Sequence, residues 1–83
     1  MIFSNWRRLT ENEVRMAKQV FADSIDFNRI KIYRGIPLLP NPNTAIAPNG
    51  NIYFPRKHCP DDFTQAGIAY KIWLIHELTH VWQ

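Results

Sequence analysis

The last quarter of the chain is a proline-free segment, residues 63–83, that is apolar on nearly every side when it is drawn as a helix. At 100° per residue, its large apolar side chains spread over most of the circumference; they include Ile68, Leu74, Ile75, Leu78, Val81 and Trp82. A helix of this kind is normally buried, and the short chain before it cannot easily wrap it. We therefore expect a partner, a second copy in a homodimer, or further polypeptide to cover it, unless its last turn is simply exposed.

Length and composition indicate one small globular domain, residues 1–83, which can also be a module of a longer chain. The 83 residues are 46% hydrophobic and 20% charged, and the single cysteine, Cys59, excludes an internal disulfide. No apolar run is long enough to cross a bilayer, and the first residues lack the apolar stretch of a signal peptide. We expect a protein of a reducing compartment, or one exported by a route that needs no cleaved signal. The net charge of +3 is scattered, which argues against nucleic-acid binding.

The first two elements can be predicted from local signals. Thr10 and Glu13 have the spacing of a capping box, so a helix should begin there and run to about Asp23. In residues 28–33, Ile30 and Ile32 alternate with polar neighbours, as in a strand with one covered face.

Two further elements follow. A loop rich in proline and glycine should extend to about Asn43. The pair Asn49-Gly50 lies between two apolar segments and predicts a β-hairpin over residues 44–54. Asp61 or Asp62 can cap the final helix, which should begin near Asp62. The fold class is therefore α+β, with an N-terminal helix, a small sheet formed by a strand and a hairpin, and a long C-terminal helix.

The final helix contains the motif His-Glu-x-x-His at residues 76–80. His76 and His80 are one turn apart on one helix face, so both imidazoles can bind one metal ion, with Zn²⁺ the default. Glu77 lies beside them, where its carboxylate can take a proton from a metal-bound water as general base. The alternative is that these are two partly exposed histidines next to a surface glutamate.

A third ligand cannot be identified from the spacing. If the helix were continuous from Asp62, roughly 21 Å would separate that residue from His76, which excludes His58, Cys59, Asp61 and Asp62 unless the helix breaks near Gly67. The candidates that remain within the chain are Glu11, Glu13, Asp23, Asp26 and Tyr33. Otherwise the ligand comes from downstream chain or a partner, or water fills the position.

The hairpin suggests how a peptide substrate could bind. Residues 51–54 are candidates for an edge strand that pairs with an extended peptide beside the metal. Tyr53 or Tyr33 could then polarise the substrate carbonyl. The alternative for each tyrosine is a packed ring with its hydroxyl in water.

Three segments, residues 26–33, 45–54 and 73–83, resemble the zinc-metallopeptidase-like core domain of extracellular contractile injection systems. They are also similar to modules related to the spike proteins of type VI secretion, and His-Glu-Leu-Thr-His-Val-x-Gln is their most specific part. The resemblance implies a module fused to other domains, with His76 and His80 as metal ligands and Glu77 as the catalytic acid/base. Family members often have a histidine where this sequence has Tyr33, which leaves the role of that position open.

The sequence therefore predicts a minimal zincin-like domain that hydrolyses peptide bonds. The resemblance implies a bacterial injection or secretion system as its setting, with the protein in the bacterial cytoplasm or exported by a secretion system without a cleaved signal. The alternative is an inactive zinc-binding module that loads a cargo or binds a partner protein.

Overall fold

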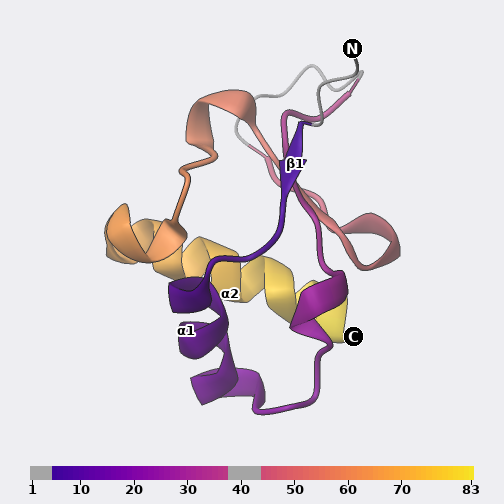
Figure 1. Ribbon diagram of the computed structural model, residues 1–83. Coiled ribbons are helices and arrows are strands. Elements are labelled where there is room, and N and C mark those ends of the chain that lie inside the picture. Colours follow the sequence, from indigo (N-terminus) through magenta and orange to yellow (C-terminus); the bar gives the residue numbers. More distant parts are fainter. Residues whose placement is uncertain (1–4, 38–43) are drawn as a thin grey trace.

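Within residues 5–37 and 44–83, which the computed structural model describes, the chain forms two helices, three short strands and four 3₁₀ turns. The helices and strands are β1 (Trp6–Arg7), α1 (Glu11–Phe21), β2 (Ile32–Arg34), β3 (Ile52–Phe54) and α2 (Ile68–Trp82). In Figure 1, α2 crosses the molecule between α1 and the sheet. The predicted α+β class is confirmed. The predicted loop to Asn43 falls partly on residues 38–43, outside the described residues.

The start of α1 follows the predicted capping box. The Thr10 hydroxyl accepts a hydrogen bond from the Glu13 backbone N–H at 3.1 Å, and the Glu13 carboxylate accepts one from the Thr10 N–H at 2.9 Å. The helix ends at Phe21, two residues before the predicted end, and Ala22 takes a positive φ of 51°. Ala17 and Phe21 point into the core.

Glu13 also binds two groups that the sequence did not connect to it. Its fully buried carboxylate accepts hydrogen bonds from both terminal nitrogens of Arg7, at 2.8 and 2.9 Å, and from the Phe63 N–H at 2.8 Å. This carboxylate therefore joins β1, α1 and the segment that precedes α2.

The sheet has the strand order β1-β2-β3. β1 is antiparallel to β2, with Trp6 opposite Tyr33, and β2 is parallel to β3, with Ile32 opposite Ile52. The predicted strand over residues 28–33 is confirmed only in its last part, because a 3₁₀ turn, Phe27–Arg29, occupies its start. β1 was not predicted, since two residues show no periodicity.

The predicted hairpin is reduced to one bridged pair. Ile46 and Tyr53 exchange two backbone hydrogen bonds of 3.0 and 2.8 Å. Between them, Pro48–Gly50 forms a 3₁₀ turn in which Asn49 has a φ of 56°, a conformation that asparagine tolerates. β3 lies between β2 and Ile46, so residues 51–54 are not the free edge that the sequence suggested.

The prediction that the final helix begins near Asp62 is wrong. The Asp62 carboxylate accepts a hydrogen bond from the Thr64 N–H at 2.9 Å, but it caps only a 3₁₀ turn, Phe63–Gln65. Gly67 then takes a φ of 108°, which is incompatible with a right-handed helix. α2 begins at the next residue, Ile68.

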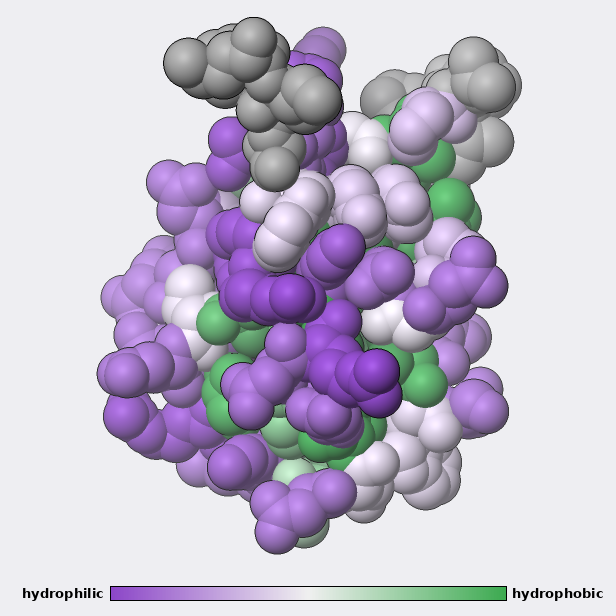
Figure 2. Space-filling view, turned by 45° about the vertical axis from the view of Figure 1, so that its right-hand side comes forward, coloured by the Kyte–Doolittle hydropathy of each residue, from purple (hydrophilic) through white to green (hydrophobic). Residues whose placement is uncertain are grey.

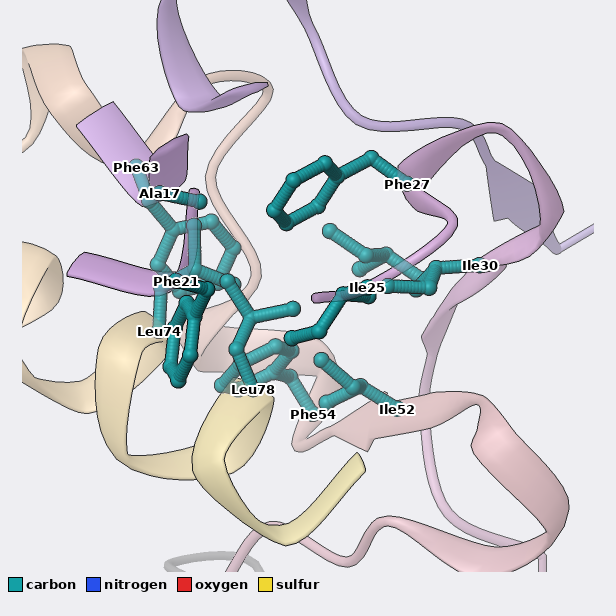
Figure 3. Packing of buried hydrophobic residues seen from close by; sticks show 11 residues of the cluster. Ala17, Phe21, Ile25, Phe27, Ile30, Ile52, Phe54, Phe63, Leu74 and Leu78 are labelled. Carbon is teal, nitrogen blue, oxygen red and sulfur yellow. The ribbon is translucent and has the colours of Figure 1, made fainter. Parts of the chain in front are cut away.

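The core lies between the two helices and the inner face of the sheet. Leu74 and Leu78 project from α2 towards Phe54 and Ile52, with Phe21 of α1 beside them (Figure 3). The Phe54 ring also meets Phe63 at 4.5 Å and Trp73 at 5.0 Å between centroids. This packing fixes which side of α2 faces inward.

The surface seen in Figure 2 is mainly hydrophilic, and apolar atoms are visible in small areas between the polar side chains. In the part of the chain that the structure describes, neither helix has the length and apolar character needed to cross a membrane.

Candidate metal centre

The two histidines of the motif converge on the outer side of α2. Leu74 and Leu78 face the core with no exposed surface, whereas His76 and His80 are exposed. Each histidine lies two residues after one of these leucines, which is roughly 160° around the helix axis. Packing of the leucines therefore presents both imidazoles to solvent.

The spacing of the imidazoles suits one shared metal ion. Their Nε2 atoms are 3.2 Å apart. Two nitrogens bound to one tetrahedral zinc, each at about 2.0–2.1 Å, would be separated by about 3.3 Å. The pair therefore fits two ligand positions of a zinc site without a change in the helix.

Glu77 lies between the histidines and the core. It follows His76 directly and is roughly 60° around the axis from Leu74. Its side chain is 5% exposed, in contrast to the two exposed histidines. The motif thus places a buried carboxylate next to a pair of solvent-facing nitrogens.

No third protein ligand completes this pair among residues 5–37 and 44–83, where no group of three histidine, cysteine or acidic side chains could hold a metal. Glu13, one of the candidates, is fully used by Arg7, Thr10 and Phe63. Asp26, another, caps the turn at Asn28. Glu11 and Asp23 form no such group with the histidines either, and the ring of Tyr33 stacks on that of Tyr53.

His58 was excluded as a third metal ligand on the premise of a continuous helix from Asp62. Such a helix would hold His58 too far from the motif. That premise is wrong, since the helix breaks at Gly67. The His58 Nδ1 atom lies 3.1 Å from the Tyr70 hydroxyl, and its ring is 6.2 Å from that of Trp73. His58 thus contacts α2 one to two turns before the motif, through a contact that spacing alone did not reveal.

The two tyrosines predicted to bind substrate lie together, but on the outer face of the sheet. Their rings stack at 4.3 Å with an angle of 7° between planes. Side chains alternate along a strand, so Tyr33 and Tyr53 point away from Ile32 and Ile52, which face the core and α2. The structure therefore groups these tyrosines with each other, and their contact with a substrate carbonyl stays a prediction.

α2 also has an uncovered apolar side, and its coverage by a partner, a second copy or further polypeptide stays a prediction. Ile68, Ile72 and Trp82 are 70%, 62% and 55% exposed. They follow the i, i+4, i+14 spacing of a single stripe along the helix. Ile72 lies one turn before His76, so the stripe adjoins the exposed histidines.

Comparison with known proteins connects the chain with type VI secretion. No family model matches it. The spike protein VgrG2b of Pseudomonas aeruginosa, described as a type VI secretion system protein, is 38% identical in an alignment of 80 positions that covers 93% of this chain and 8% of VgrG2b. The solved effector domain of VgrG2b matches with a TM-score of 0.84 at 36% identity, over 93% of this chain and 44% of that domain's chain. The chain is thus homologous to a part of a type VI secretion effector domain.

Proposed function

From this homology we propose that the chain is a zinc-binding, peptidase-like module of a bacterial type VI secretion effector. The observation that carries the proposal is the convergence of the His76 and His80 Nε2 atoms at 3.2 Å beside the buried Glu77. The partners we propose are a protein substrate and the secretion machinery, by analogy with the spike protein to which the chain is similar. Export through that machinery requires no cleaved signal.

Each residue of the motif can have a separate role in peptide hydrolysis. His76 and His80 would hold Zn²⁺, which supplies a Lewis acid when it is bound. The Glu77 carboxylate would accept a proton from the attacking water and pass it to the leaving amine. Because Glu77 is buried, its side chain stays next to the histidines. This position favours proton transfer from a water at the metal.

A second candidate function is an inactive zinc-binding module that loads cargo or binds a partner. It is favoured by the finding that only two metal ligands converge within the described residues, whereas a catalytic zinc site has three protein ligands. In this case the metal bound by the motif stabilises the structure or takes part in recognition, and neither role requires Glu77.

One set of variants separates the two candidates. Zinc content is measured per purified chain for the wild type, His76→Ala and Glu77→Gln, and hydrolysis is followed with fluorescently labelled casein. A zinc-dependent peptidase loses zinc in His76→Ala, and in Glu77→Gln it keeps zinc but loses hydrolysis. If the wild type binds zinc but never cleaves, the loading module is favoured. If the folded wild type binds no zinc at neutral pH, both candidates are wrong.

A further inference from the structure

Two large apolar side chains lie beside the candidate metal centre, one turn before it on α2. Ile72 is four residues before His76 and is 62% exposed, and Trp73 is three residues before His76 and half-buried. Residues three and four apart are neighbours on a helix surface, so both side chains adjoin the first histidine. The zinc binding and proton transfer proposed above use neither of them.

The two side chains lie on opposite sides of the direction in which the histidines point. At 100° per residue, Ile72 is roughly 60° to one side of the midpoint between His76 and His80. Trp73 is roughly 40° to the other side, which is the side of Glu77. Side chains on a helix lean towards its N-terminus, so both imidazoles lean towards the space between Ile72 and Trp73. This space therefore adjoins the metal-binding atoms.

Contacts with three other rings hold Trp73 in place. Its ring lies 5.0 Å from that of Phe54, 6.1 Å from that of Tyr70 and 6.2 Å from that of His58, measured between centroids. Phe54 is fully buried, so the indole is anchored to the core. The part of Trp73 that stays exposed is therefore a fixed surface, and a ligand that packs on it does not have to order it.

α2 provides no charged partner on this side. Apart from the histidines, Lys71 and Glu77 are the two charged residues within Ile68–Trp82, all of which the structure describes. Lys71 is roughly 160° around the axis from the midpoint of the histidines, and Glu77 is buried. A charged side chain between Ile72 and Trp73 would lose water without a partner from α2. An apolar side chain would instead bury its own surface together with theirs.

We infer that Ile72 and Trp73 form the two walls of a subsite for a large apolar side chain, such as that of leucine, next to the scissile bond of a peptide. The inference rests on the proposed function, because it assigns the substrate class of the same site. Ile72 precedes His76 by roughly 6 Å along the helix axis, which is about two residues of extended peptide. A side chain on the residue next to the scissile bond can therefore reach it.

The test measures the binding of small hydroxamates, which bind zinc directly, to the zinc-loaded protein by isothermal titration calorimetry. Ac-Leu-NHOH and Ac-Asn-NHOH carry side chains of similar shape, one apolar and one polar, and Ac-Gly-NHOH carries none. We expect the leucine probe to bind at least fivefold more tightly than the other two. Ile72→Asn should reduce this advantage to less than twofold. Val20→Asn, the matched control at an exposed site on α1, should leave it unchanged.

The outcomes distinguish this inference from the metal centre itself. Equal binding of the three probes, or equal effects of the two variants, would overturn the subsite and leave the metal centre supported. Tighter binding of Ac-Asp-NHOH than of the leucine probe would also overturn it, since Arg56 and Lys57 would then be the better explanation. If the folded protein binds none of the probes, the subsite is wrong together with the metal centre. Circular dichroism verifies that each variant is folded.

A second readout uses the fragments of casein that a hydrolysing protein releases. Mass spectrometry identifies the cleaved bonds, and we expect a large apolar residue on at least one side of most of them. The preference should be weaker in Ile72→Asn than in Val20→Asn. Apolar residues that flank cleaved bonds no more often than uncleaved ones would contradict the subsite even if hydrolysis itself is established.

Discussion

Ile72 and Leu74 are two positions apart on α2, yet Ile72 is 62% exposed and Leu74 is fully buried. The same helix thus has one side that stabilises this fold and another that does not contribute to it. Truncation of Leu74 to alanine should lower the free energy of unfolding by about 2–5 kcal/mol, because it leaves a cavity against Phe54. Ile72→Ala is the matched control, with an expected change within about 0.5 kcal/mol. Urea denaturation measures both, and similar losses would contradict the assignment of sides.

The exposed stripe predicts a tendency to associate. Ile68, Ile72 and Trp82 place apolar area in water along one line of α2. Contacts between copies through this line should therefore form at high concentration, and Ile72→Glu should reduce them. Sedimentation equilibrium measures the average mass, with Val20→Glu as control, since Val20 is 59% exposed but lies on α1. If both variants behave like the wild type, the homodimer predicted through the final helix is wrong.

Glu13 should be among the most sensitive polar positions in the chain. Replacement by alanine leaves the Arg7 guanidinium without its partner and removes the acceptor of the Phe63 N–H. We expect a loss of about 3 kcal/mol or more in the free energy of unfolding, as for other buried ion pairs that lose one member. Glu11→Ala, at an exposed site in the same helical turn, should cost less than about 1 kcal/mol. A Glu13→Ala protein as stable as the Glu11→Ala protein would show that the ion pair does not support the fold.

Gly67 is expected to require its positive φ. A Cβ at this position would meet nothing within 4 Å, so the cost of Gly67→Ala is conformational rather than steric crowding. At a φ of 108° we expect a loss of about 1–3 kcal/mol for L-alanine. D-alanine prefers positive φ and, introduced by chemical synthesis, should be tolerated. Thermal unfolding followed by circular dichroism compares the two proteins, and equal midpoints would refute the argument.

The Cys59 thiol should react slowly. Burial raises its pKa, so at a given pH a smaller fraction is thiolate than in a free cysteine, and the reaction rate should rise only at higher pH. Arg34 acts in the opposite direction and lowers this pKa, so Arg34→Gln should shift the pH profile of alkylation further upward. The rate with iodoacetamide between pH 7 and 10 tests this, with glutathione as reference. A profile that coincides with that of glutathione would contradict it.

Local patterns predicted local structure well. The capping box of Thr10 and Glu13 was correct because both partners lie within four residues. The motif was recognised, and its side chains converge, because the helix itself brings His76 and His80 together. The start of α2 was misplaced because Asp62 gives the same capping signal for one 3₁₀ turn as for a long helix.

Long-range structure could not be derived in this way. The ion pair of Arg7 with Glu13 depends on where β1 lies after folding, and no periodicity marks a strand of two residues. The parallel pairing of β2 with β3 is set by the path of the chain between them rather than by their own residues. The contact of His58 with Tyr70 likewise depends on the break at Gly67.

The hydrogen bond from the Phe63 N–H to Glu13 spans 50 residues of sequence. We do not expect such a contact to form early in folding, because the entropy of closing so long a loop must first be offset by other interactions. We expect it to form once α1 and the turn Phe63–Gln65 have already met. Interactions made this late act mainly on the rate at which the native state opens. We therefore expect the buried carboxylate of Glu13 to lengthen the lifetime of the folded module more than it speeds its formation.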